Sequence, residues 1–292
     1  MSVLAKCMAW CLAIGLTGCA SFPQSTGNAS TAEGQRLLES SANAHGIAAY
    51  RRLRDVSVSY DGEWASLVTR LQPVLVDSNF RGKSEERLLV AARSIGQIHS
   101  GPSGVKVVTR TPEGVAVAYN SIPESDPEKR AAAALVADGY RLFLLGPIYL
   151  TERNAIVEAM GTDVIDGQEY DKVFARIRPG LGEAREDRVV LWIDRRSGLT
   201  RRLWMSADGL PSTQGVVAEI DLDDYISSAG VQWPTRFIER LKRPFPIDVH
   251  RWRLTGLDVN RGFDANDLSI AGFAGAARAP AKPLTVKPLQ KK

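Results

Sequence analysis

The second half of the chain consists of short stretches in which apolar and polar residues alternate. Between residues 156 and 259 these stretches are separated by turn-forming sequences such as Asp166-Gly167. The turns recur about every 10 to 15 residues, a spacing typical of antiparallel strands that follow one another along the chain. The pattern predicts an antiparallel meander for this half of the protein.

Alternation also separates two faces of the predicted sheet, because successive side chains of a strand point to opposite sides. In residues 233–242 aromatic and aliphatic side chains fall on one face and arginines on the other, and residues 249–256 repeat this division. The segments 189–194 and 201–206 each add one tryptophan. The apolar face is therefore predicted to carry Trp192, Trp204, Trp233, Phe237, Trp252 and Leu254. The opposite face is predicted to be rich in arginine.

The first half of the chain mixes helices with strands. Residues 32–53 place apolar side chains near helical spacing and predict one amphipathic helix. Residues 56–60 alternate and predict a strand that ends at the turn pair Asp61-Gly62. The stretch 87–98 fits either a helix or a strand. Two further strands are predicted at 105–109 and 115–119.

A very apolar helix is predicted in the middle of the chain. Asp126 is a good N-cap residue, and Pro127 suits the first helical position. Residues 130–145, which include Leu142 and Phe143, are too apolar for a helix on the surface. We therefore expect this helix to pack into the apolar face of the sheet. The predicted fold class is α+β: one strongly curved antiparallel sheet, a half-barrel over residues 32–275, with helices covering its concave apolar face.

The N-terminus carries an export pattern. Lys6 precedes an apolar run over residues 7–16, which is too short to span a bilayer and is typical of a signal peptide. The run ends in Leu-Thr-Gly-Cys at residues 16–19, which resembles the bacterial lipobox. This resemblance implies a signal peptide at 1–18, acylation of Cys19 with groups such as palmitate, and a membrane anchor. The alternative is an ordinary secreted protein cleaved near Ala20.

The residue after the lipobox cysteine bears on location. Ala20 stands where aspartate would signal retention in the inner membrane, so the resemblance implies the outer membrane, with the protein facing the periplasm. Residues 19–31 are small and polar and predict a lipidated tether. With Cys7 and Cys11 removed with the signal peptide, the mature chain has no pair of cysteines for a disulfide.

The C-terminal residues 276–292 are rich in alanine, proline and lysine and predict a disordered basic tail. This tail and Lys6 contain six of the 37 basic residues, so the remaining body carries a net charge of about −2 against 33 acidic residues. The composition gives no reason to expect nucleic acid as a partner.

The residues that carry enzyme chemistry are sparse. The three histidines, His45, His99 and His250, lie in unrelated segments, and no metalloprotease, redox or nucleophile-elbow motif occurs. Aspartates crowd residues 221–224 and 258–267, but they lack the spacing of a calcium loop and suit turns. We therefore expect no catalytic residue, no metal ligand and no cofactor.

The order of elements resembles the LolA/LolB-like lipoprotein-localisation superfamily. The sequence LWIDRRSGLTRRLWM at 191–205 is similar to the hairpin of that family, and residues 230–239 and 252–254 are similar to its closing strands. The resemblance covers residues 32–262. It implies a carrier of a hydrophobic ligand or a sensor in the cell envelope.

Two functions follow as alternatives. In the first, the apolar side of the half-barrel is a cavity that binds a lipid, an acyl chain or the lipidated end of another protein. Its candidate wall residues are Leu142, Phe143, Trp192, Trp204, Trp233, Phe237, Trp252 and Leu254. In the second, these residues fill a solid core, and the protein is a non-catalytic scaffold or sensor that binds an envelope protein.

Overall fold

The computed structural model describes residues 22, 23, 25, 27–274 and 282–285. The predicted signal peptide and Cys19 lie outside the described residues, as does most of the predicted basic tail. Within the described part, no helix combines the length and the apolar character needed to cross a membrane.

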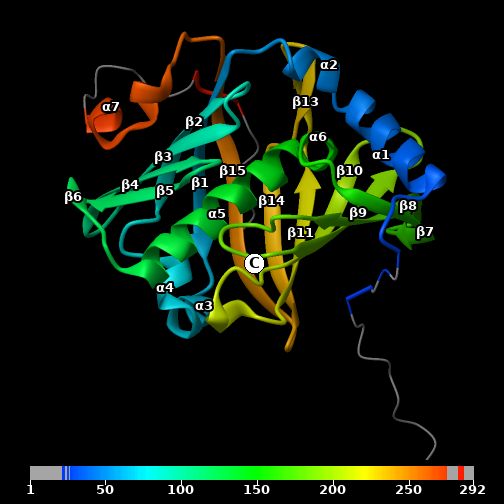
Figure 1. Cartoon of the computed structure of the whole chain (residues 1–292), viewed down its shortest axis with the longest axis horizontal. Helices are drawn as coiled ribbons and strands as arrows, with labels where there is room; N and C mark the ends of the chain where they lie inside the picture. Colours follow the sequence, from blue (N-terminus) through cyan, green and yellow to red (C-terminus); the bar gives the residue numbers. More distant parts are fainter. Residues whose placement is uncertain (1–21, 24, 26, 275–281, 286–292) are drawn as a thin grey trace, which may run out of the picture.

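One antiparallel sheet of 13 strands forms the body, with strand order β6-β5-β4-β3-β2-β1-β15-β14-β11-β10-β9-β8-β7. It curves around the long helix α5, and its two end strands do not pair with each other (Figure 1). The predicted α+β class and the curved antiparallel sheet are confirmed. The strands are β1 (Asp55–Trp64), β2 (Lys83–Leu89), β3 (Ser94–Gly101), β4 (Gly104–Thr111), β5 (Gly114–Tyr119), β6 (Ile122–Pro123), β7 (Ile156–Ile165), β8 (Gln168–Ile177), β9 (Asp187–Asp194), β10 (Thr200–Ser206), β11 (Val217–Asp223), β14 (Arg236–Arg243) and β15 (Ile247–Val259). A separate two-stranded sheet contains β12 (Ile226–Ser228) and β13 (Val231–Trp233).

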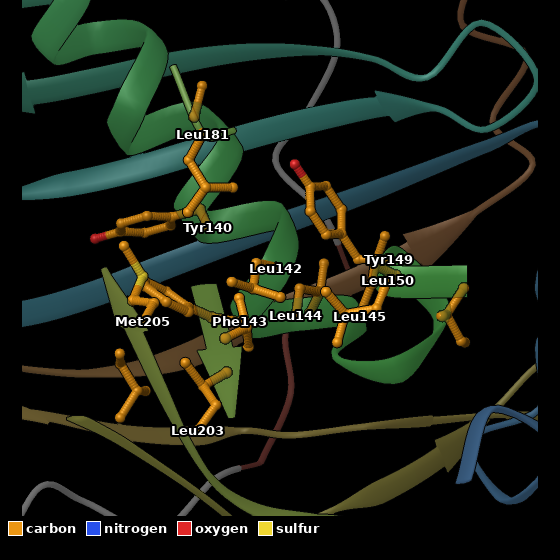
Figure 2. Close-up of a cluster of buried hydrophobic side chains, with 14 of the residues drawn as sticks. Tyr140, Leu142, Phe143, Leu144, Leu145, Tyr149, Leu150, Leu181, Leu203 and Met205 are labelled. Atoms are coloured by element: carbon orange, nitrogen blue, oxygen red, sulfur yellow. The ribbon is translucent and has the colours of Figure 1, made fainter. Parts of the chain in front are cut away.

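Helix α5 (Pro127–Leu145) crosses the concave face of the sheet, as predicted. The side chain of Asp126 accepts hydrogen bonds from the backbone N–H groups of Glu128 and Lys129, so it caps the helix. Short α6 (Pro147–Glu152) continues beyond Gly146. Almost every residue from Ala132 to Leu150 is buried, and Figure 2 shows Tyr140 and Phe143 of α5 on the side of Met205 and Leu203 of β10.

The remaining helices cover other parts of the sheet. The helix predicted over 32–53 is two helices, because Gly46 adopts a left-handed conformation (φ 86°) that interrupts it. Residues 66–76, for which the sequence predicted no structure, form a pair of short helices beside α5 (Figure 1). The bounds are α1 (Ala32–Ala44), α2 (Ile47–Tyr50), α3 (Ser66–Leu71), α4 (Pro73–Val76) and α7 (Ile270–Ala274), with 3₁₀ turns η2 (Pro211–Thr213) and η3 (Ala265–Leu268).

Two local predictions need correction. Asp61-Gly62 is not a turn: β1 runs through it to Trp64, and Gly62 lies opposite Trp252 of β15. A Cβ at residue 62 would lie 2.6 Å from the Cβ of Trp252, so the glycine allows a close approach of two strands. The stretch 87–98 is neither one helix nor one strand, because it contains the turn between β2 and β3.

The described part of the C-terminal tail is paired with the sheet, which differs from the predicted disorder. The backbone N–H of Leu257 donates to the oxygen of Lys282 (3.0 Å), and the N–H of Leu284 donates to the oxygen of Thr255 (2.9 Å). Strand β14 pairs with β15 only up to Arg253, so the edge of β15 beyond that residue has free backbone groups. Residues 282–285 pair with these groups, as an exposed strand edge invites.

This pairing predicts that the tail contributes to stability. Deleting residues 276–292 removes both hydrogen bonds and the contact of Leu284 with the core, which together are worth about 1–3 kcal/mol. For a domain of this size we expect a fall in melting temperature of about 5 °C. A truncation that keeps Thr285 retains both bonds and is the control. Equal melting temperatures of the two truncated proteins would show that the pairing is not stabilising.

Candidate functional site

An apolar cavity of about 100 Å³ lies between the inner face of the sheet, α5 and the helix pair α3–α4. Its floor is formed by β10, β11, β14 and β15, and its cover by α3 and α4. The apolar lining residues are Trp64, Val68, Leu75, Val76, Leu135, Val136, Gly139, Tyr140, Phe143, Met205, Ala207, Val216, Ala218, Leu241 and Val249. Figure 2 shows three of these residues near one another: Tyr140 and Phe143 of α5, and Met205 of β10.

Helix α5 keeps this cavity open at one position. Gly139 lines the cavity, although glycine in the middle of a helix costs about 0.5–1 kcal/mol relative to alanine. A Cβ at residue 139 would meet only the ring of Phe143, at 3.5 and 3.7 Å, which is ordinary van der Waals contact. Packing therefore does not require glycine here. The residue leaves space in the cavity at a cost in helix stability.

The cover of the cavity is held by a few contacts. Val68 and Val76 pack on Val249 of β15 as a small separate cluster. The side-chain amide of Gln72 donates to the backbone oxygen of Ser212 in η2 (3.0 Å), so it joins the cover to the opposite rim. On the outer side of α3, Leu67 and Leu71 are about half exposed. The cover is thus a short, partly apolar element that also packs on the main core through Val74 and Leu75.

Two charged side chains border this mostly apolar cavity. Arg81 and Glu239 both line the cavity. Burial raises the pKa of Glu239 to about 7, and the nearby positive charge of Arg81 opposes this shift only in part. The Arg81 guanidinium lies over the ring of Trp64, 4.7 Å from its centroid.

The opposite, outer face of the sheet carries rows of paired charges. Arg202 Nε and Arg240 Nη1 contact the two carboxylate oxygens of Asp221 at 2.7 and 2.8 Å. Burial alone would raise the pKa of Asp221, but the hydrogen bonds from these arginines outweigh it and hold the pKa below its usual value. Glu219 shares Arg202 and Arg240 with Asp221, and Asp223 pairs with Arg201 and Arg236. The face is arginine-rich, as predicted, but its charges are largely balanced. Among the described residues no group of three or more histidine, cysteine or acidic side chains is placed to hold a metal ion.

Comparison with known proteins identifies the fold. No family model matches the sequence, and no curated protein matches it. The structure is similar to that of a LolA superfamily protein from Nitrosomonas europaea, with a TM-score of 0.52 over 82% of this chain and 98% of that one, at 12% identity. The chain has a LolA-like fold. It is also similar to a DUF1329 family protein from Desulfovibrio piger, with a TM-score of 0.51 over 83% of this chain and 99% of that one, at 9% identity.

Six of the eight predicted wall residues lie in the main core of the LolA-like domain: Leu142, Phe143, Trp233, Phe237, Trp252 and Leu254. Only Phe143 among them also lines the cavity. Phe237 and Trp252 stack with ring centroids 5.0 Å apart, and Trp252 also stacks on His250. Trp233 belongs to the small β12–β13 sheet and not to the strand that carries Phe237. The interior is thus filled over much of its area and open beside α3 and α4.

The placement of Trp192 and Trp204 on the inner face is wrong. Both lie on the outer face, with ring centroids 5.0 Å apart, because Leu191 and Leu203 take the inward positions of their strands. The two tryptophans contribute to a second apolar cluster, with Phe22, Tyr170, Phe174, Val190 and Val217. The described end of the predicted tether is therefore packed against the domain: Phe22 is buried, and its ring contacts Phe174 and Arg188.

Several cavity residues were not found from the sequence. Trp64 and Arg81 come from segments for which the sequence predicted no element, and Tyr140 comes from the predicted apolar helix. Gly139, a helix-breaking residue inside a very apolar helix, was the one available signal. The other positions depend on how α3 and α4 fold over the sheet.

Proposed function

We propose that this protein is an outer-membrane lipoprotein that faces the periplasm and binds a hydrophobic ligand in the cavity between α3, α4 and α5. The ligand class is a lipid, an acyl chain or the lipidated end of another protein. The observation that carries the proposal is the apolar cavity bordered by Gly139, where a more stable helix would place a side chain. Burial of apolar ligand surface there contributes roughly 25 cal/mol per Å². The chemistry is binding alone, without a catalytic group.

The proposed anchor is the lipobox at residues 16–19, with acylation of Cys19 after removal of residues 1–18. A LolA-like fold suits a periplasmic carrier of lipids. The filled part of the interior around Trp252 and Phe237 supports the second candidate, a scaffold or sensor that binds an envelope protein. The two candidates differ in whether the purified protein takes up a hydrophobic probe.

Variants at Gly139 test the cavity directly. Gly139→Ala adds one methyl group and should raise the free energy of unfolding by about 0.5–1 kcal/mol, because alanine favours the helix. Gly139→Leu places a larger side chain in the cavity and should abolish binding of the neutral fluorescent probe N-phenyl-1-naphthylamine while the fold persists. Circular dichroism reports the fold, and probe titration reports the site. Gly139→Ala is the matched control.

The scaffold candidate gives a different result. If the wild type does not bind the probe, or if Gly139→Leu binds it as well as the wild type, the cavity is not the ligand site. Native mass spectrometry of protein purified from membranes would then detect no co-bound lipid.

A further inference from the structure

One cation lies inside the domain between two cavities. Arg81 is 5% exposed, and it lines both the apolar cavity and a second cavity of about 20 Å³. Tyr140 of α5 also lines both. The walls of the small cavity are mostly polar and include Asp61, Lys83, Ser84, His99 and His250. The larger, apolar cavity and the smaller, polar cavity therefore share Arg81 and Tyr140 as wall residues.

The hydrogen bonds of Arg81 go to neutral groups. Its Nη1 donates to the backbone oxygen of Leu75 (2.8 Å), and its Nη2 donates to the hydroxyl of Tyr140 (3.3 Å). Within the described residues, no carboxylate lies at ion-pair distance from the Arg81 guanidinium. A buried cation without an anion is costly, since the aromatic rings and carbonyl oxygens around it replace only part of its hydration.

The acidic side chains around Arg81 compensate its positive charge poorly. Burial raises the pKa of Glu86 to about 8 and that of Glu239 to about 7, so both are largely or partly protonated near neutral pH. Asp77 is engaged by Lys106 Nζ and by the Tyr119 hydroxyl, each at 2.8 Å. Asp61 lies 3.8 Å from the guanidinium of Arg253. The site between the two cavities thus has a positive charge that no neighbouring carboxylate balances closely.

We propose that the two cavities form one binding site for a single-chain amphiphile with an anionic head, a carboxylate or a phosphate, which Arg81 binds. The proposal rests on the proposed function and names its ligand class. The acyl chain lies in the apolar cavity, and the head faces the small polar cavity, where Arg81 and the Tyr140 hydroxyl donate hydrogen bonds. The small cavity holds roughly one water-sized group, so the head is compact. Hydrogen bonds from a guanidinium to an anion are about twice as strong as neutral ones.

A displacement assay tests the head and the chain separately. The wild-type protein is loaded with N-phenyl-1-naphthylamine, and the probe is displaced by dodecanoate, dodecyl phosphate or dodecanol, which share one chain length. We expect one or both anions to displace the probe at a concentration at least about tenfold lower than dodecanol. Comparison of the two anions distinguishes a carboxylate from a phosphate head.

Variants at Arg81 test whether this residue binds the anionic head group of the ligand. Arg81→Gln should abolish the preference for the anions while dodecanol still displaces the probe, and Arg81→Lys should keep part of the preference. Arg36→Gln is the control, since it removes the same charge from an exposed pair on α1. If Arg81→Gln does not fold, Arg81→Lys and the wild-type comparison carry the test.

The outcomes separate this inference from the proposed function. Equal displacement by the anions and by dodecanol in the wild type overturns the anionic head and leaves the apolar site intact. A preference that persists in folded Arg81→Gln assigns the head to another residue and also overturns the inference. Absence of any probe binding contradicts the proposed function itself.

Discussion

Replacing Trp252 with alanine should lower the free energy of unfolding by about 3–5 kcal/mol. The side chain is 1% exposed and stacks on Phe237, His250 and Tyr140, with ring centroids 4.5 to 5.6 Å apart. The variant loses these contacts and leaves a void beneath α5, which a close-packed interior does not refill. Urea unfolding followed by circular dichroism measures the effect.

A matched comparison uses Trp204→Ala, which removes the same side chain from the partly buried outer cluster. We expect its cost to be smaller, because part of this tryptophan already contacts solvent. A charged variant sharpens the distinction between core and cavity wall. Phe237→Asp should fail to fold, since Phe237 lines neither cavity and an aspartate at a packed interior position has neither water nor a partner. A folded Phe237→Asp protein would show that this part of the aromatic stack borders open space.

Replacing Cys19 with alanine should move the protein from the membrane fraction to the soluble periplasmic fraction and abolish labelling by radioactive fatty acid. The acylated residue provides the whole anchor in the proposed lipoprotein, and each buried CH₂ group of its chains contributes about 0.8 kcal/mol. Fractionation and labelling are both read on the same cultures. Cys7→Ala, within the predicted signal peptide, should retain the label and serves as the control.

A second variant tests the proposed membrane. Ala20→Asp keeps the acylated cysteine but introduces the residue that signals inner-membrane retention, so we expect labelled protein to shift to the inner membrane. Membrane partition and labelling that are unchanged in Cys19→Ala would contradict the lipobox interpretation.

The sequence predicted the helix start, the turn and the strand pattern that depend on residues close together in the chain. The Asp126 cap and Pro127 determine where α5 begins, and the turn at Asp166-Gly167 joins β7 to β8 as expected. The curved antiparallel sheet followed from alternation and turn spacing. These features depend on residues within a few positions of one another, so a single sequence contains them.

The site depended on long-range packing and was mostly missed. Strands β9 and β10 carry large apolar residues on both faces, so alternation alone does not say whether Leu191 or Trp192 points inward. Phe22 packs in the outer cluster with Trp192 and Trp204, so tryptophans on the outer face of these strands are shielded from solvent. The cavity itself requires α3 and α4 to fold over strands that lie far away in the sequence.

The burial of Phe22 shortens the connection between Cys19 and the folded domain. A free segment from Cys19 to residue 31 would reach roughly 40 Å when extended, whereas three residues from Cys19 to Phe22 reach only about 10 Å. With a lipid on Cys19, the connection to the membrane would be a short tether. The volume accessible to the domain would then be more than about tenfold smaller than with a free segment up to residue 31. In the proposed lipoprotein, the outer side of β8 and β9, where Phe22 docks, would then stay next to the bilayer. A ligand or partner would meet such a protein at the membrane surface.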